Sequence, residues 1–235
     1  IPKLQLPFKN PQVGISNTIN LRTAELIHPG IIGILKTMPG VPLANIQHYP
    51  SREAVLKGIA TQLGIPSCKL ILSAGSDLMI SVLMEALGIL TGRVILQHPT
   101  YPSWANYAAL RKLDIQFIRF GEKRPYTFCL QTFILTLESS LPSLVVLTHP
   151  HSPTGFCFST KELKLLSDAC VKNGHMLLID ACYTGFTLPN FMPEIMADHV
   201  IFIKSFSKSF GIAGARVALT VASEEITTYL SHWRT

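Results

Sequence analysis

The sequence predicts an α/β protein with three αβα layers, in which a mainly parallel sheet carries helices on both faces. From Lys69 onward, short apolar runs typical of buried strands alternate with longer segments whose apolar residues recur at helical spacing. Small and polar clusters follow several of these apolar runs directly. Such clusters stand at the carboxyl ends of strands, where open α/β sheets bind their ligands.

Size and composition narrow the class of protein. The 235 residues are 48% hydrophobic and 14% charged, which is enough for one core and at most part of a second domain. A formal net charge of +6 suits an anionic ligand, and the lack of Lys/Arg runs argues against a nucleic-acid partner. The five scattered cysteines include no CxxC pair, so we expect no disulfide framework, no metal site and a reducing, cytoplasmic location. The most apolar long window, 71–90, carries two carboxylates, so a membrane span is not expected. The sequence also shows no signal peptide.

The amino-terminal part is expected to contain two helices. Residues 1–48 are rich in Pro and Asn and form an irregular segment with one helix from His28 to Thr37. Ser51 can cap the next helix, and Gly64 ends it. The apolar positions that fall on one face of this helix are Val55, Ile59 and Leu63.

The rest of the chain follows an alternating order. Apolar runs predict strands at Lys69–Ser73, Arg93–Gln97, Ile115–Phe120, Leu144–Thr148, Met176–Ile179, His199–Ile203 and Val217–Ala222. Helices are expected from Gly75 to about Leu90, Ser103 to Leu113, Ser159 to Gly174 and Ser223 to Trp233. The third of these begins with a capping box, Ser159 with Glu162, and directs Leu163, Leu166 and Cys170 inward. The stretch from Thr127 to Ser140 is ambiguous.

The cluster Gly75-Ser76-Asp77 links the first of these strands to an apolar helix. Free backbone N–H groups and the positive end of a helix attract an anion at such a turn, so the cluster is a candidate phosphate site. An ordinary helix cap is the alternative.

The segment from Ser205 to Arg216 lies between the last two predicted strands. A lysine at a strand end, such as Lys208, can lose its proton in a water-poor pocket and attack a carbonyl to form a Schiff base. The hydroxyls of Ser205 and Ser207 and the planar cation of Arg216 are groups that bind phosphate. A Schiff-base lysine beside a phosphate site meets the needs of pyridoxal phosphate. A solvated basic turn is the alternative.

Asp180 ends the strand before the lysine segment, in the sequence Asp180-Ala181-Cys182-Tyr183. A buried carboxylate at this edge of the sheet needs a cationic partner. Cys182 has no histidine beside it in the sequence, so we interpret it as a small core residue and not as a nucleophile.

The motif S-x-S-K-x-x-G-x-x-G-x-R resembles the lysine signature of the class I/II aminotransferases, which are fold-type I pyridoxal-phosphate enzymes. Three further motifs occur in that family's order: Gly75-Ser76, Pro153-Thr154-Gly155, and Asp180 with Tyr183. The nearest relatives by these motifs are histidinol-phosphate aminotransferases and threonine-phosphate decarboxylases. The resemblance covers residues 17–235.

The resemblance implies roles for individual residues. Asp180 would pair with the protonated pyridine nitrogen, Tyr183 would bind the ring oxygen, and Tyr101 would stack on the ring. Cofactor-binding residues would be Gly75, Ser76, Asp77, Tyr101, Ser152, Asp180, Tyr183, Ser205, Ser207, Lys208 and Arg216, with Tyr49 reaching in from the partner subunit of a homodimer. Three positions depart from the family pattern: His149 and Ser152 stand in place of Asn, and Ala181 in place of Glu.

The implied function is that of an aminotransferase that acts on an amino acid and a 2-oxo acid, with Lys208, Asp180 and Tyr183 as catalytic residues. A decarboxylase using the same cofactor and a non-catalytic domain of the same fold stay open. The resemblance divides the chain into an amino-terminal segment, 1–48, a cofactor-binding large domain, 49–222, and the start of a helix, 223–235. A small carboxyl-terminal domain with the substrate-binding arginine is expected to be absent, so the chain as given should bind cofactor but turn over substrate poorly.

Overall fold

The fold is described from a computed structural model that places residues 24–42, 47–48, 51–121, 127–186 and 192–233. In this described part, seven strands form one sheet in the order β1-β7-β6-β5-β4-β2-β3. The strands are β1 (Leu70–Ser73), β2 (Arg93–His98), β3 (Asp114–Arg119), β4 (Leu144–Thr148), β5 (Met176–Asp180), β6 (Val200–Ser205) and β7 (Ala218–Val221). Strands β2 to β6 run parallel, which confirms the mainly parallel sheet.

Strand β7 departs from this pattern, because it runs antiparallel to both of its neighbours, β1 and β6. The connection from β6 to β7 holds only a short 3₁₀ turn, Ala213–Ala215. A parallel return would need a longer crossover, so the chain folds back beside β6 in the opposite direction. This reversal was not predicted from the sequence.

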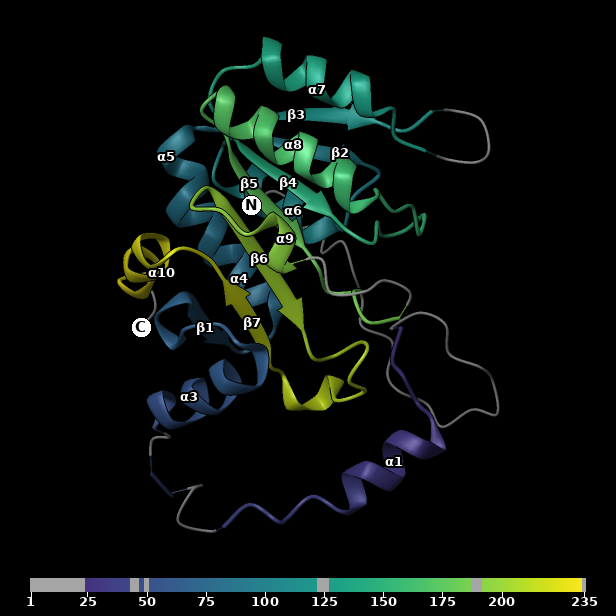
Figure 1. Cartoon of the computed structure of the whole chain (residues 1–235), viewed down its shortest axis with the longest axis vertical. Coiled ribbons are helices and arrows are strands. Elements are labelled where there is room, and N and C mark those ends of the chain that lie inside the picture. Colours follow the sequence, from purple (N-terminus) through teal and green to yellow (C-terminus); the bar gives the residue numbers. More distant parts are fainter. Residues whose placement is uncertain (1–23, 43–46, 49–50, 122–126, 187–191, 234–235) are drawn as a thin grey trace, which may run out of the picture.

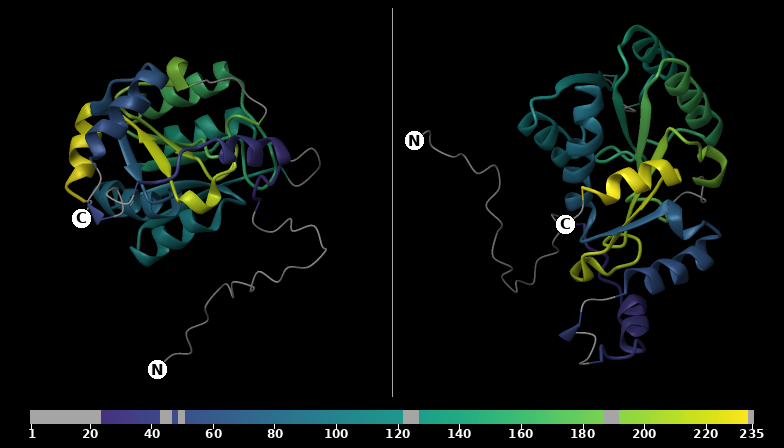
Figure 2. Two further views of the ribbon diagram at one scale, coloured as in Figure 1. Left: turned by 90° about the horizontal axis from the view of Figure 1, so that it is seen from below. Right: turned by 90° about the vertical axis from the view of Figure 1, so that its left-hand side faces the viewer.

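Helices cover both faces of the sheet, as predicted (Figure 1). One face carries α3 (Arg52–Leu63), α7 (Leu130–Ser139), α8 (Thr160–Lys172) and α9 (Met192–Ile195). The other face carries α4 (Ser76–Leu83), α5 (Ile89–Thr91), α6 (Pro102–Leu110) and α10 (Glu224–Ser231). The strands alternate between the two cores: Val145 and Leu147 of β4 join the first, and Leu144 and Val146 join the second. The three layers are visible in Figure 2.

Several local predictions are confirmed. The capping box of α8 forms, since Ser159 N donates to Glu162 Oε2 at 2.7 Å and Glu162 N donates to Ser159 Oγ at 3.3 Å. Gly64 ends α3 in the left-handed region with φ 65°. The buried residues of α8 include Leu163, Leu166 and Cys170. The ambiguous stretch is a helix, α7.

Other predictions are wrong in detail. The inner face of α3 is Leu56, Ile59 and Ala60, whereas Val55 is 48% exposed, because the sheet lies on the other side of the helix. The helix that begins at Ser76 passes through a π-helical turn, Met84–Gly88, before α5. The apolar residues of this helix are not all buried, since Leu78 is 51% exposed. The four-residue helix α9 was not predicted.

The predicted amino-terminal helix is α1 (Pro29–Lys36), which lies beside the β6–β7 connection and away from the sheet (Figures 1 and 2). A Cβ atom on Gly211 would lie 2.7 Å from Ile31 Cγ2, so the two segments are in close contact. Tyr49 lies outside the described residues. The predicted domain boundaries stay a prediction. None of the helices described is long and apolar enough to cross a bilayer.

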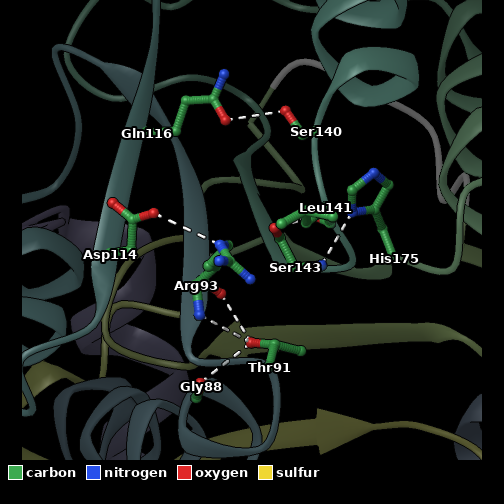
Figure 3. Close-up of polar contacts among 9 residues, drawn as sticks. All are labelled: Gly88, Thr91, Arg93, Asp114, Gln116, Ser140, Leu141, Ser143 and His175. Carbon is green, nitrogen blue, oxygen red and sulfur yellow. Dashed lines mark hydrogen bonds and ion pairs between the residues drawn. The ribbon is translucent and has the colours of Figure 1, made fainter.

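The two edges of the sheet differ. At the amino ends of the strands, polar side chains bond to nearby backbone and to one another (Figure 3). Thr91 Oγ1 donates to Gly88 O at 3.1 Å, Arg93 pairs with Asp114 at 3.5 Å, and His175 Nδ1 accepts from the backbone N–H of Ser143 at 3.0 Å. These contacts hold strand starts and helix ends together. The sequence-predicted site residues follow the carboxyl ends, at the opposite edge.

Candidate active site

A cavity opens at the carboxyl ends of the parallel strands. Its walls are formed by Ser76, Tyr101, Thr148, Ser152, Asp180, Cys182, Tyr183, Ser205 and Lys208. All but Thr148 and Cys182 are residues that the sequence had marked as site residues. They meet because the strands are in register at this edge, with Thr148 beside Asp180 and Asp180 beside Ile203.

Asp180 is the buried charge of this cavity, with 3% of its surface exposed. Its Oδ2 accepts from Trp104 Nε1 at 3.0 Å, and its Oδ1 accepts from the backbone N–H of Cys182 at 3.1 Å. Burial raises the pKa of Asp180, and hydrogen bonds from the Cys182 side chain, the Trp104 indole and the Cys182 backbone oppose that rise because they favour the charged form. A cation bound in the cavity would lower the pKa of this carboxyl in the same way.

Lys208 and Tyr183 stand on the wall nearest the β6–β7 connection. Lys208 Nζ lies 5.8 Å from the centroid of the Tyr183 ring. Burial raises the pKa of the Tyr183 hydroxyl, and a hydrogen bond with the hydroxyl of Ser152 partly offsets this. The lysine, the tyrosine and the serine therefore lie near one another, and all three line the cavity together with Asp180.

A cradle for an anion lies beside the cavity. Gly75 precedes α4 with φ 87° and ψ 163°, a backbone conformation that glycine alone adopts readily. A Cβ atom at Gly75 would lie 2.6 Å from Arg216 Nη2, so the guanidinium lies directly over the backbone of this turn. Arg216 Nη1 donates to Ser207 Oγ at 3.4 Å, and Ser207 N donates to Ser205 Oγ at 3.1 Å. The turn after β1 and the end of the lysine segment meet because β1 and β7 are neighbours.

Asp77 does not line the cavity but holds a residue that does. Its Oδ1 accepts from Tyr101 Oη at 3.0 Å and from Ser103 Oγ at 2.8 Å. Burial and the nearby carboxylates raise the pKa of Tyr101 to about 12, so its hydroxyl stays protonated and acts as the donor. The carboxylate thus anchors the ring of Tyr101 at the cavity wall.

Two buried histidines follow β4. Burial lowers the pKa of both His149 and His151 to about 4. His151 Nε2 lies 2.9 Å from Pro99 O, and because a carbonyl oxygen only accepts, this nitrogen carries the proton. His151 Nδ1 then accepts from Thr154 Oγ1 at 2.9 Å. The neutral imidazole therefore ties the loop after β2 to the loop after β4.

Sequence reasoning missed Trp104 and Thr148. Trp104 is fully buried, and a buried indole usually finds an acceptor for its N–H, but the sequence does not say which one. Thr148 is 2% exposed and lines the cavity, and in the described part of the chain its Oγ1 has no hydrogen-bond partner. A ligand atom or a water is the natural partner of such a hydroxyl. No group of three or more His, Cys, Asp or Glu side chains among the described residues could hold a metal ion.

Comparison with known proteins assigns the family. Residues 40–235 match the family described as aminotransferase class I and II. The chain belongs to this family. A curated relative, the histidinol-phosphate aminotransferase of Thermoanaerobacter pseudethanolicus, is 27% identical over 191 residues, which cover 80% of this chain and 52% of the relative. The chain thus spans about half the length of that relative.

Solved structures of other proteins share the fold of this chain. Histidinol-phosphate aminotransferase from Sinorhizobium meliloti, in complex with pyridoxal-5'-phosphate, superposes with a TM-score of 0.74 at 18% identity, over 89% of this chain and 57% of that one. L-threonine-O-3-phosphate decarboxylase from Porphyromonas gingivalis superposes with a TM-score of 0.65 at 18% identity, over 81% and 58%. The fold-type I architecture implied by the sequence motifs is therefore confirmed.

Proposed function

We propose that this chain binds pyridoxal phosphate through Lys208 and forms the cofactor-binding part of an aminotransferase. The observation that carries the proposal is a single cavity in which a lysine, a buried carboxylate and a tyrosine meet beside an anion cradle. Family membership supports the cofactor, since the structural relative from S. meliloti was solved with it.

The residues present fit the cofactor. The cradle of Gly75 and Arg216 offers backbone N–H groups and a planar cation to the phosphate, and a side chain at Gly75 would obstruct it. Asp180 is a buried carboxylate whose charged form a protonated ring nitrogen would stabilise. Among the residues that the structure describes, Thr148 Oγ1 has no hydrogen-bond partner, so this polar group of the wall is available to a ligand.

Each side chain then has a defined task. When bound, the cofactor supplies an electron sink that stabilises negative charge at the α-carbon of an amino acid. The Asp180 carboxylate would accept a hydrogen bond from the protonated ring nitrogen, and its negative charge would keep that proton on the ring. Lys208 Nζ would hold the cofactor at its aldehyde carbon and would move a proton at the α-carbon of the substrate, as general base and general acid. Tyr183 and Ser152 present hydroxyls at the wall next to the lysine.

The experiment is reductive labelling of the cofactor-saturated protein. Borohydride reduction followed by peptide mapping should place the pyridoxyl group on Lys208. Lys208→Arg should abolish the label and the visible absorbance of bound cofactor. Lys204→Arg is the matched control, because Lys204 lies four residues earlier and its Nζ donates to Thr184 O at 3.2 Å, outside the cavity wall. A label on another lysine, or none in a folded and saturated sample, would refute the proposal.

The amino donor and acceptor are proposed only as chemical classes, an amino acid and a 2-oxo acid, and this proposal rests on membership of the aminotransferase family. We further propose a cytoplasmic homodimer in which Tyr49 of one subunit reaches the phosphate bound by the other. Tyr49→Phe should then weaken cofactor retention without unfolding the protein, and unchanged affinity in a proven dimer would contradict this role.

A decarboxylase is the second candidate, because a structure named as one shares the fold. The two reactions differ in product: release of carbon dioxide marks the decarboxylase, and formation of a 2-oxo acid marks the aminotransferase. A domain with no catalytic activity would take the label on Lys208 and yield neither product with any amino acid.

A further inference from the structure

Trp104 combines complete burial with a directed polar contact. Its side chain is 0% exposed, inside the core formed by α4, α6 and the strands facing them. Its indole N–H points at Asp180 Oδ2, at 3.0 Å, across 76 residues of sequence. Tyr101, which lines the cavity, lies directly before the same helix, α6, so one helix start presents a ring to the cavity and an N–H to its carboxylate.

We propose that Trp104 is a positioning residue: its indole N–H holds the Asp180 carboxylate in the charged state and in the orientation that receives a cationic ring nitrogen. This inference rests on the proposed function, because the ring nitrogen belongs to the cofactor. The indole is well suited to the task. Its N–H donates and never accepts, so it can only favour the ionised carboxylate, and a fully packed ring has one orientation.

The two donors to Asp180 divide its oxygens. The backbone N–H of Cys182 occupies Oδ1, and Trp104 occupies Oδ2. Each carboxylate oxygen accepts two bonds, so both keep a lone pair for the cavity. Removing the indole donor would leave the carboxylate held through Oδ1 alone and would raise the free-energy cost of its buried charge.

Other charged or titratable groups face Asp180 from the surrounding elements. Asp77 of α4 raises the pKa of Asp180 by charge repulsion. Tyr101, Cys182 and Tyr183 lie near it as neutral groups, each with a pKa raised above its usual value, and a hydrogen bond from the Cys182 side chain lowers the pKa of Asp180 as the indole does. Lys208 lines the same cavity and can supply positive charge to it. Only the contact from Trp104 brings a side-chain N–H within hydrogen-bond distance of Oδ2 in the described residues.

The test replaces the N–H without changing the shape of the ring. In a Trp233→Phe background, Trp104 is the single tryptophan, so biosynthetic incorporation of 3-benzothienylalanine exchanges one N–H for sulfur at this position alone. Trp104→Phe is the genetic counterpart, and the Trp233→Phe chain is the control. Circular dichroism and the melting temperature establish that each variant is folded; if the Phe variant fails to fold, the isosteric analogue carries the test.

Two measurements decide the outcome. Carbon-13 NMR of aspartate-labelled, cofactor-free chain, assigned with Asp180→Asn, follows the titration of Asp180 itself. We expect the analogue to raise its pKa by about one unit, a tenfold change in the protonation equilibrium. Equilibrium dialysis with pyridoxal phosphate should then show the same affinity as the control well above the raised pKa, and an affinity that becomes about tenfold weaker as the pH falls below both pKa values.

The results separate this inference from the proposed function. An unchanged Asp180 titration in a folded analogue chain overturns the role of Trp104, whether or not the cofactor binds. A shifted titration with cofactor affinity unchanged at every pH also overturns it, because the charge would then serve something other than the ring nitrogen. Failure of the proposed function shows instead as a missing pyridoxyl label on Lys208 in the control chain.

Discussion

Gly75→Ala is a direct perturbation of the anion cradle. At φ 87° and ψ 163°, a residue with a Cβ atom costs about 1–3 kcal/mol of stability. The added methyl would lie 2.6 Å from Arg216 Nη2 and 3.2 Å from Cζ, closer than real contacts allow, so the guanidinium must move away. A charge-assisted hydrogen bond contributes about 1.5–3 kcal/mol, so losing the contact of Arg216 with the phosphate should weaken cofactor binding about 10- to 150-fold.

The assay separates the two effects. Urea unfolding of the cofactor-free chain measures the backbone cost, and equilibrium dialysis with pyridoxal phosphate measures the loss of affinity. Gly92→Ala is the matched control, since Gly92 also has a positive φ, 66°, but no atom lies within 4 Å of the added Cβ. It should lose stability and keep its cofactor affinity. Wild-type affinity in a folded Gly75→Ala chain would show that Arg216 does not hold the phosphate there.

Two further predictions concern the groups around the cavity. Asp77→Ala removes the acceptor that anchors Tyr101, and because that ring is 37% exposed we expect only about a tenfold loss of cofactor affinity by dialysis, with little change in the melting temperature. Equal affinity for both chains would contradict the anchoring role. For the buried pair His149 and His151, the folded pKa of about 4 lies below the usual 6.5, so their neutral forms stabilise the fold above pH 6.5 and this contribution is lost as the pH falls toward 4. Each shift corresponds to about 3 kcal/mol; His151→Gln should flatten the decline in unfolding free energy between pH 6.5 and 4, and an unchanged slope would argue against a buried neutral imidazole.

Much of the fold could be predicted because its signals are local. Most strands, such as β4 and β6, are short runs of mainly apolar residues, and Ser159 with Glu162 marks a helix start within four residues. The direction of a strand and the buried face of a helix depend on residues outside that element. The antiparallel course of β7 depends on the short connection before it, and the buried face of α3 depends on where the sheet lies.

In the candidate site, too, local sequence signals could be predicted and contacts between distant residues could not. Lys208, Asp180 and Tyr183 were predicted because their residue types follow predicted strands in a recognisable motif, and they line one cavity. Trp104 was missed because its acceptor lies 76 residues away along the chain. Thr148 was missed because it stands out only by its hydroxyl, which has no hydrogen-bond partner within the described structure. A sequence pattern does not show whether a hydroxyl has a partner.

Because β1 pairs with β7, the anion cradle beside the cavity is completed only after nearly all of the described sheet has been synthesised. Gly75 follows the first strand of the sheet and Arg216 precedes the last, and the two meet only when β7 lies between β1 and β6. A chain grows on the ribosome from its amino end, so the parallel strands β2 to β6 can associate while the cradle still lacks its cation. A nascent chain stalled after β6 would carry Lys208 without Arg216 and would retain pyridoxal phosphate poorly. Capture of the cofactor would therefore mark the moment at which the last strand joins the sheet.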